Sequence, residues 1–392
     1  MSMDRRAFLA ATAAASIVTT SGGAFAQGKK YRACIIGDTK DGGYGHDVHL
    51  IFKTRPDVEV VSLADPDEAG RAQHAADCGA KTQYADYKEM LAKEKPNLVA
   101  VCPRTTPRHK EYLLACAEVG AHGFIEKPLC VDLAEADEII AAMEAKQLKW
   151  SIGFNFRSTP LVQHAKKLIF ENKVIGSVLE VRTRGKEDDN RAGGEDMIVL
   201  GCHLLDLVNF LFGKPQWCVS DITFNGKAAT KENITEATEP LGPIVGNRIN
   251  ATYGLAGGVN AYFSSMKSRD GNGGRWGMDI YGTQGVMSIR QNIGPEIFVL
   301  KDPSWSPGGS DVKWEPMPNA PESPDQGDRL LRYSIIVNDL IDSIEKNKQP
   351  TINLNSGRDS LELVQAVFES YVQGQRVEIP LKERSHPLKR WA

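Results

Sequence analysis

GAHGFIEKPL, residues Gly120 to Leu129, is the stretch of this sequence that decides the fold. Its short apolar run ends in Glu126, Lys127 and Pro128, so a buried strand would deliver two charged side chains to the edge of a sheet. Pro128 cannot donate to a strand ladder, and it favours an extended backbone at Lys127. In an open parallel sheet this edge binds ligands, and the alternative is a solvated strand end with a chance charge pair.

A glycine-rich turn lies at the start of the same pattern. Residues 31–37 (YRACIIG) predict a strand that ends in Gly37, and residues 48–52 predict the start of a helix. Gly42 and Gly43 lie between them. Backbone N–H groups in such a turn can bind a pyrophosphate. The spacing is not a strict GxGxxG and the loop is long, so a purely structural loop is the alternative.

An acidic residue, Asp65, ends the second predicted strand, within residues 58–71 (VEVVSLADPDEAGR). A carboxylate there accepts hydrogen bonds from both ribose hydroxyls of NAD. It would repel the 2′-phosphate of NADP by about 4 kcal/mol at about 4 Å with an effective dielectric constant of about 20, so we predict NAD over NADP. The alternative role of Asp65 is to cap the next helix, which Asp67 could do equally well.

Three features of the sequence carry a resemblance to a known family: the alternating strands and helices up to the EKP triplet, GCHLLD (residues 201–206), and GRDSLELVQAVFESYVQGQRVEIPL (residues 357–381). In these features the sequence resembles the glucose-fructose oxidoreductase, inositol dehydrogenase and rhizopine-catabolism (Gfo/Idh/MocA) family. The resemblance covers nearly the whole chain after residue 26. It implies an NAD-binding Rossmann domain over residues 29–152. It also implies an α+β domain over residues 153–392 with a large, mostly antiparallel open sheet, and homodimers or homotetramers.

The resemblance also assigns residues to a cofactor site and a catalytic site. The loop after the third strand, with Pro103 and Arg104, would lie against the nicotinamide half, beside Glu126 and Lys127. Arg104 departs from the family's usual TPN pattern, and it could face a diphosphate or an acidic substrate. Lys127 would hold the oxygen of a secondary alcohol and take its proton or stabilise the alkoxide, while hydride moves to NAD.

A second candidate centre lies in GGEDMIVLGCHLLD, residues 193–206. His203 and Asp206 are three positions apart at the start of an apolar helix, so they share one face. An imidazole with a carboxylate partner is a competent proton acceptor near neutral pH. The family's usual Asp four positions earlier is Val199 here, and Asp196 or Glu195 are the candidates to replace it. A lone histidine on a helix is otherwise a structural residue.

Substrate contacts are predicted from the second half of the chain. Alternation in residues 178–184 (VLEVRTR) gives one polar face, which in the family is typical of a sheet wall that lines a sugar site. We therefore predict Arg157, Arg184, Lys186 and His203 as residues that contact a small sugar substrate. We predict no metal ion in the site.

The first 26 residues are similar to a twin-arginine export signal. Arg5 and Arg6 precede an alanine-rich run that is too short and too weakly apolar to span a membrane, and an AFA sequence predicts cleavage after Ala26. We therefore expect a periplasmic or otherwise exported protein with no membrane span in the mature chain. A fortuitous basic N-terminus is the alternative.

Composition narrows the remaining classes of function. The chain of 392 residues has a net charge of −3 and no basic patch, so nucleic-acid binding is not expected. Its seven cysteines include no CxxC pair, and we predict that most are small buried hydrophobes.

Three hypotheses remain on the sequence alone. The first is an NAD-linked oxidoreductase of a sugar, polyol or sugar derivative. The second is a glycosidase or lyase that oxidises its sugar transiently with tightly held NAD. The third is a binding protein that has kept the fold and lost turnover, which the altered glycine loop and Val199 would favour.

Overall fold

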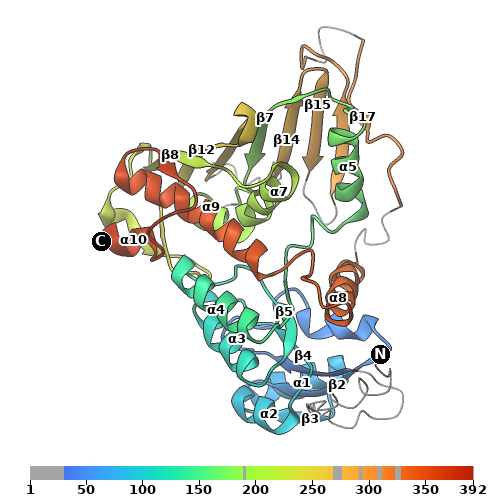
Figure 1. Ribbon diagram of the computed structural model, residues 1–392. Coiled ribbons are helices and arrows are strands. Elements are labelled where there is room, and N and C mark those ends of the chain that lie inside the picture. Colours follow the sequence, from blue (N-terminus) through green and yellow to red (C-terminus); the bar gives the residue numbers. More distant parts are fainter. Residues whose placement is uncertain are drawn as a thin grey trace, which may run out of the picture.

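The computed structural model describes residues 31–188, 191–267, 276–290, 295–306, 311–322 and 328–391 of the chain. The predicted export signal, residues 1–26, lies outside this part. The described residues form two sheets, a lower one from the N-terminal third and an upper one from the rest of the chain, with helices between and around them (Figure 1).

The lower sheet has six parallel strands in the order β3-β2-β1-β4-β5-β6. Its central strands are apolar and fully buried, as expected for a sheet with helices on both faces. The order reverses direction between β1 and β4, which creates a crevice at the carboxyl ends of these strands and confirms the predicted Rossmann fold. The strands are β1 (Tyr31–Ile36), β2 (Val58–Ala64), β3 (Thr82–Tyr84), β4 (Leu98–Val101), β5 (His122–Ile125) and β6 (Trp150–Ile152).

Helices connect these strands, and three of them begin at an aspartate. The side chains of Asp67, Asp86 and Asp132 accept hydrogen bonds from backbone N–H groups in the first turns of α1, α2 and α4. After the glycine loop, where we predicted the start of a helix, the chain forms the short 3-10 helix η1. The helices are η1 (Val48–Thr54), α1 (Glu68–Cys78), α2 (Tyr87–Glu94), η2 (Thr106–Arg108), α3 (His109–Glu118) and α4 (Leu133–Ala145).

The upper sheet is mostly antiparallel, as predicted, with one parallel pair between β7 and β13. Its order is β17-β16-β15-β14-β7-β13-β12-β8-β18, and β9 pairs with β8. The strands are β7 (Val178–Arg184), β8 (Trp217–Phe224), β9 (Lys227–Ala228), β12 (Arg248–Gly254), β13 (Asn260–Met266), β14 (Gly277–Gly282), β15 (Gly285–Arg290), β16 (Glu296–Leu300), β17 (Glu315–Pro316) and β18 (Val377–Glu378). A separate pair joins β10 (Ile234–Glu236) to β11 (Pro243–Val245).

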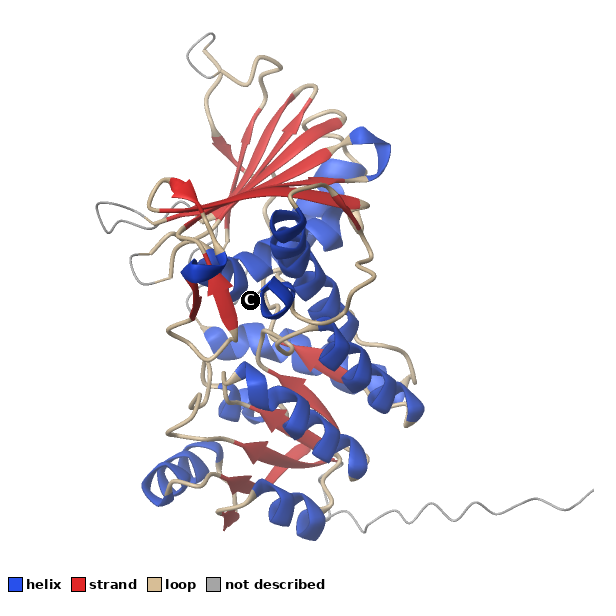
Figure 2. Cartoon of the chain, turned by 90° about the vertical axis from the view of Figure 1, so that its left-hand side faces the viewer, coloured by secondary structure: helices blue, strands red, loops and turns tan. Residues whose placement is uncertain are grey.

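Helices cover the face of the upper sheet that looks toward the lower one (Figure 2). Tyr253 of β12 is fully buried under α9 and donates a 2.9 Å hydrogen bond to the carbonyl of Leu363. The helices and turns of this half are α5 (Pro160–Phe170), α6 (Gly194–Asp196), the π-helix η3 (Met197–Gly201), α7 (Cys202–Phe212), η4 (Lys231–Asn233), η5 (Ala256–Gly258), α8 (Arg329–Glu345), α9 (Leu354–Gln373) and α10 (Pro387–Trp391).

Helix α8 leaves the upper half and packs against η1, β5 and β6 of the Rossmann sheet (Figure 1). Tyr333 of α8 meets Phe124 of β5 edge-on, with ring centroids 5.6 Å apart, and both side chains are buried. Burying such a side chain is worth about 1.5–3 kcal/mol. The late segment that follows residue 328 therefore forms part of the wall around the carboxyl end of β5.

All seven cysteines are buried and free, which confirms their predicted role as small hydrophobes. Over the part of the chain that the structure describes, none of the helices combines the length and the apolar character needed to cross a membrane.

Candidate active site

A cavity of about 650 Å³ opens at the carboxyl end of β5, where the two halves of the chain meet. Glu126 and Lys127 line it from the Rossmann half, and Val199 and His203 line it from the second half. The two groups that the sequence predicted for the chemistry, one amine and one imidazole, therefore line the same cavity. Helix α8 contributes Arg332 and Tyr333 to its wall.

Glu126 is a buried carboxylate with two partners. Its Oε2 accepts a hydrogen bond from the backbone N–H of Lys127 at 3.0 Å, and its Oε1 pairs with Nδ1 of His46 at 3.0 Å. Burial would raise the pKa of Glu126, but the hydrogen bond and charge of His46, with the charge of Lys127, outweigh burial and hold that pKa at about 2. Glu126 is therefore ionised throughout the physiological pH range.

Lys127 is buried, and its Nζ donates a hydrogen bond to the carbonyl oxygen of Val199 at 3.0 Å. Val199 lies in the π-helix η3, and single π-turns of this kind are frequent at functional sites. The position where the family usually has an aspartate thus offers Lys127 a backbone carbonyl in place of a carboxylate.

His203 lies in the first turn of α7 and is buried among aromatic rings. Its ring centroid is 4.8 Å from that of Phe156, 5.6 Å from Phe154 and 6.0 Å from Trp276, and its Nδ1 has no hydrogen-bond partner. Burial, and then the charge of Lys127, lower the pKa of His203 well below its usual value. The imidazole is therefore neutral at physiological pH and can accept a proton.

Asp206 and Arg157 form a separate buried ion pair, with Arg157 Nη1 3.0 Å from Asp206 Oδ1. Arg157 also donates to the carbonyl of Thr351 and to Oγ of Ser356. Burial raises the pKa of Asp206 to about 7 despite the arginine. Neither residue lines the cavity, and the pair ties α7 to the start of α9. These contacts do not support the predicted catalytic role of Asp206 or the predicted substrate contact of Arg157.

Asp196 and Glu195 do not replace the missing aspartate either. Asp196 accepts hydrogen bonds from Ser265 Oγ at 2.6 Å and from the backbone N–H groups of Lys186 and Glu187 at 3.2 Å, and burial raises its pKa to about 6. Glu195 accepts hydrogen bonds from the backbone N–H and hydroxyl of Thr238 and from the backbone N–H of Glu239. Both carboxylates anchor loops, so the predicted catalytic role of Asp196 is not supported by its contacts.

The polar face of β7 does not form the predicted sugar-site wall. Arg184 pairs with Glu187 at 3.1 Å and does not line the cavity, whereas Lys186, in the loop after β7, does. Arg182, on the same face as Arg184, is exposed and pairs with Glu180. Val181 and Thr183, on the other face of β7, are buried, so Arg182 and Arg184 lie on the face that points away from the core, and no residue of β7 lines the cavity.

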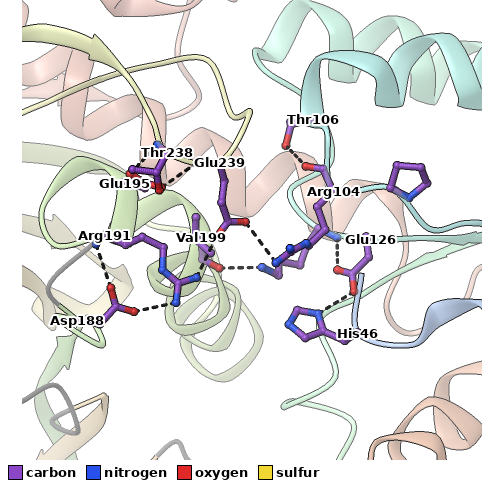
Figure 3. A network of polar contacts seen from close by, with 12 residues as sticks. His46, Arg104, Thr106, Glu126, Asp188, Arg191, Glu195, Val199, Thr238 and Glu239 are labelled. Atoms are coloured by element: carbon purple, nitrogen blue, oxygen red, sulfur yellow. Dashed lines mark hydrogen bonds and ion pairs between the residues drawn. The ribbon is translucent and has the colours of Figure 1, made fainter. Parts of the chain in front are cut away.

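Sequence reasoning missed a cross-domain network at the rim of the cavity (Figure 3). Glu239 lies 2.9 Å from Arg191 and 3.6 Å from Arg104, and Arg191 also pairs with Asp188 at 2.8 Å. Both arginines line the cavity. His46 was missed as well, although its position in GYGHD, within the glycine loop, was a usable signal. No sequence motif indicated Arg191.

The glycine loop folds back on itself and touches the loop after β4. Asp38 and Gly43 form an isolated antiparallel bridge, and Gly42 has a φ of 87° that favours glycine. The carbonyl of Gly42 accepts a hydrogen bond from the backbone N–H of Arg104 at 3.1 Å, and Thr105 Oγ1 donates to Asp41 at 2.6 Å. We call this the loop contact.

Two other predicted cofactor residues also have local roles in this region. The carbonyl of Pro103 lies 2.8 Å from Nε2 of His109, the buried histidine that opens α3. Gly43 has a φ of 63° and open space where a side chain would be, so it serves the turn rather than a close approach.

Asp65 is fully buried, and its contacts differ from the predicted ribose contact. One oxygen accepts hydrogen bonds from Tyr44 Oη at 2.7 Å and from the N–H and hydroxyl of Thr39, and the other accepts from the N–H of Asp67. The ring of Tyr44 lies directly over Gly37. The argument from Asp65 for NAD over NADP is therefore not supported by these contacts.

The crevice offers room for the two ends of a dinucleotide. Beside the 650 Å³ cavity, a second cavity of about 170 Å³ is lined by Gly37, Asp65 and Tyr112, among others. The glycine loop contributes residues to both cavities, and it touches the loop after β4 at the loop contact. A pyrophosphate at the predicted position, beside Gly42 and Gly43, would lie next to the loop contact.

A Rossmann sheet joined to a large open sheet, with a lysine at the cleft, defines a two-domain nucleotide-dependent oxidoreductase. Comparison with family models agrees with this class. Residues 32–154 match the oxidoreductase family's NAD-binding Rossmann fold, and residues 166–379 match its C-terminal alpha/beta domain. The chain belongs to the Gfo/Idh/MocA oxidoreductase family, and NAD is the cofactor that its matched N-terminal domain binds.

Two of the curated relatives, both at low identity, are dehydrogenases. The chain is 24% identical over 252 residues to D-apiose dehydrogenase of Paraburkholderia graminis, and this match covers 62% of the chain and 63% of the relative. It is 24% identical over 257 residues to myo-inositol 2-dehydrogenase of Thermotoga maritima, covering 64% of the chain and 73% of the relative. The chain thus spans a little under two thirds of the first of these relatives.

Solved structures show the same fold over nearly the whole chain. Levoglucosan dehydrogenase in complex with NADH and L-sorbose aligns with a TM-score of 0.72 and 19% identity, over 90% of this chain and 99% of the other. An NAD binding oxidoreductase from Klebsiella pneumoniae aligns with a TM-score of 0.70 and 19% identity, again over 90% and 99%.

Proposed function

We propose that the protein is an NAD-linked oxidoreductase that acts on a secondary alcohol of a sugar, polyol or sugar derivative. The observation that supports this most is the placement of Lys127 and His203 in one cavity between the two domains. The names of the relatives, which are dehydrogenases of apiose and inositol, point to the same class of substrate.

Lys127 is the residue that would hold the substrate oxygen. Its ammonium group already donates to a carbonyl oxygen at the cavity wall, so an alcohol oxygen could take the place of the Val199 carbonyl or share the ammonium with it. A positive charge there stabilises the alkoxide that develops as the proton leaves. Bound NAD would supply the acceptor for the hydride.

His203 would accept or share the proton. Its pKa lies well below the usual value, so the ring is neutral and offers a lone pair without first losing a proton. Phe156 and Trp276 line the cavity beside the ring of His203, and these apolar rings would limit the access of water to its Nδ1. Acid-base help of this kind contributes roughly 10² to 10⁴ in rate.

The rim favours a substrate with a carboxylate. Arg104, Arg191 and Lys186 line the cavity, and Glu239 holds the two arginines in place from opposite domains. Planar guanidinium groups bind carboxylates with two parallel hydrogen bonds. An acidic sugar derivative therefore fits this rim better than a neutral sugar.

The test of this function is a turnover assay with NAD on a panel of neutral sugars, polyols and sugar acids. We expect net NADH formation with at least one of them, and faster formation with an acid. Arg104→Gln should raise KM for the acid about tenfold while changing KM for a neutral sugar little, with Arg182→Gln on the open sheet face as the control. Equal effects on both substrates would argue against a carboxylate at the rim.

A second candidate is redox cycling, in which a glycosidase or lyase holds NAD tightly and regenerates it. The loop contact favours it, because a closed crevice slows exchange of the cofactor. A further relative, 27% identical over 186 residues, is named 2,7-anhydro-N-acetylneuraminate hydratase, of Mediterraneibacter gnavus. Retained NAD with substrate consumption and no net NADH would support this candidate over the first.

A third candidate is a binding protein on the same fold. The enclosed Asp65 and the valine at position 199 favour it. Protein that contains no NAD after purification, gains none on titration with NAD, and still binds a sugar would support this candidate.

We propose that the protein is exported through the twin-arginine route, because of Arg5, Arg6 and the AFA sequence that ends at Ala26. Replacing both arginines with lysines should leave unprocessed protein in the cytoplasm. Cell fractionation and the mass of the N-terminus check this. Processed protein outside the cytoplasm in the double variant would contradict the proposal.

We also propose a homodimer or homotetramer formed through the open face and ends of the upper sheet. Leu179 of β7 is 46% exposed, and Val219 and Phe224 of β8 are 40% and 38% exposed. Val219 lies on the open face of β8, whereas Leu179 and Phe224 lie near the ends of their strands. Exposed apolar side chains of this size are typical of an interface. Gel filtration with light scattering should give at least twice the mass of one chain, and a monomer at all concentrations would contradict this.

A further inference from the structure

A cluster of three metal-binding residue types lies behind the glycine loop. His49 comes from η1, and His74 and Asp77 come from α1, three positions apart on one face of that helix. The potential ligand atoms of the three residues all lie within 4.8 Å of one another. None of them lines the 650 Å³ cavity, so this cluster is separate from the candidate active site.

The two imidazoles have buried nitrogen atoms without partners. His49 is only 4% exposed, and its Nδ1 and the Nδ1 of His74 have no hydrogen-bond partner. Burying a polar nitrogen in this way costs free energy unless something binds it. A buried imidazole nitrogen without a hydrogen-bond partner can offer its lone pair to a metal ion.

Asp77 supplies a carboxylate that can move toward the imidazoles. Its Oδ2 is 3.6 Å from Nδ1 of His74, and its side chain is 46% exposed. Lys53 donates to the backbone carbonyl of Asp77, not to the carboxylate. Zinc bonds of about 2.0–2.2 Å place tetrahedral ligands about 3.3–3.6 Å apart, so the 3.6 Å spacing of His74 and Asp77 already suits zinc. The widest spacing in the set, at most 4.8 Å, would have to shorten when an ion binds.

We propose that His49, His74 and Asp77 bind a divalent transition-metal ion of the zinc type. Two imidazoles and one carboxylate suit zinc, cobalt or nickel, whereas magnesium and calcium prefer oxygen ligands alone. Three protein ligands leave a fourth position for water. The ion links η1 to α1, two segments that flank the second strand.

The ion would also fix the glycine loop. The ring of Tyr44 stacks on His74 with centroids 3.7 Å apart, covers Gly37, and donates its hydroxyl to Asp65. His49 lies edge-on to Tyr44 at 5.1 Å. An ion that holds both imidazoles therefore holds Tyr44, and through Tyr44 the floor of the crevice. Its role is structural, because no group of the cluster reaches the cavity of Lys127.

The test uses the full-length chain without a histidine tag, stripped of metal by a chelator and then titrated with Co²⁺ and Zn²⁺. We expect one ion per chain, visible Co²⁺ absorption bands of a four- or five-coordinate site, and displacement of Co²⁺ by Zn²⁺. Absence of these bands and of any Zn²⁺ binding heat would overturn the proposal. Neither readout depends on turnover or on NAD, so this proposal can fail while the proposed function stands.

Ligand variants locate the ion. His74→Gln and Asp77→Asn replace side chains that are partly exposed, so both variants should fold, as circular dichroism can verify. Loss of an outer partner of a ligand commonly weakens metal binding about 10- to 100-fold, and loss of a ligand should cost at least as much. The matched controls are His164→Gln and Glu89→Gln, which lie outside the cluster and should keep full affinity. Unchanged affinity in both ligand variants would overturn the assignment.

Discussion

Tyr44 donates a 2.7 Å hydrogen bond from its hydroxyl to the buried carboxylate of Asp65. The contact joins the glycine loop to the end of β2, the two segments that hold the pyrophosphate and the ribose in an open Rossmann crevice. The hydroxyl of Tyr44 therefore occupies a lone pair of Asp65 that a ribose hydroxyl would otherwise use.

Replacing Tyr44 with phenylalanine should destabilise the protein by about 1.5–3 kcal/mol, because the lost hydrogen bond goes to an ionised group. Tyr253→Phe is the matched control, since that buried hydroxyl donates to a neutral carbonyl, and it should cost about 1 kcal/mol. Urea denaturation of both variants measures the difference. Equal losses would mean that the charge on Asp65 does not strengthen the contact.

Opening the loop contact should improve NAD binding. Thr105→Val removes the 2.6 Å hydrogen bond to Asp41, so a larger fraction of molecules would have an open crevice. Apparent affinity rises in proportion to that fraction, and we expect NADH to bind about three- to tenfold more tightly in a fluorescence titration. Thr183→Val, a buried threonine that donates to the carbonyl of Tyr262, is the control. Weaker binding by the Thr105 variant would contradict the proposed closure.

Lys127→Met should lower kcat/KM by about 10² to 10⁴ and leave the fold intact, because methionine keeps the length of the side chain and loses the charge. Lys166→Met is the matched control, since Lys166 also donates its Nζ to a backbone carbonyl, that of Phe210, but lies outside the cavity. Steady-state kinetics and circular dichroism measure both effects. Near-normal activity of the Lys127 variant would remove this lysine from the mechanism.

His203 should stay neutral well below pH 6.5. Burial and the charge of Lys127 lower its pKa in the folded state, so between that pKa and about 6.5 the unfolded chain binds more protons. The contribution of His203 to stability is thus complete above about pH 6.5 and is lost as the pH falls below it. Its NMR signal should not titrate from about pH 6 to 8, and Lys127→Met should raise its pKa. A signal that titrates near pH 6.5 in the wild-type protein would refute this.

Short-range sequence patterns correctly predicted those parts of the fold that depend on neighbouring residues. The alternation of strands and helices gave the Rossmann order, and the apolar run before Glu126 gave β5 and the edge where Lys127 lies. His203 was predicted because GCHLLD, residues 201–206, resembles the family's catalytic helix, and the structure places it in the first turn of α7. Each of these features depends on residues close together in the sequence.

The site residues whose contacts differ from those predicted have partners far away in the sequence. Asp206 is neutralised by Arg157, which lies 49 positions earlier, and Asp196 is held by Ser265, which lies 69 positions later. Asp65 is enclosed because Tyr44 folds back from a loop with no regular structure. The sequence around a carboxylate near the start of a helix does not show whether its partner is a ligand or a buried side chain far along the chain.

Helix α8 also determines when the cavity can exist during synthesis. It follows every strand of the upper sheet except β18 in the sequence, yet it forms the wall beside η1 and β5. In a nascent chain that has emerged only as far as Asp328, the cavity around Lys127 would lack its α8 wall and would be open to water there. Ligand capture must therefore wait until translation is almost complete, even though the Rossmann half is made first.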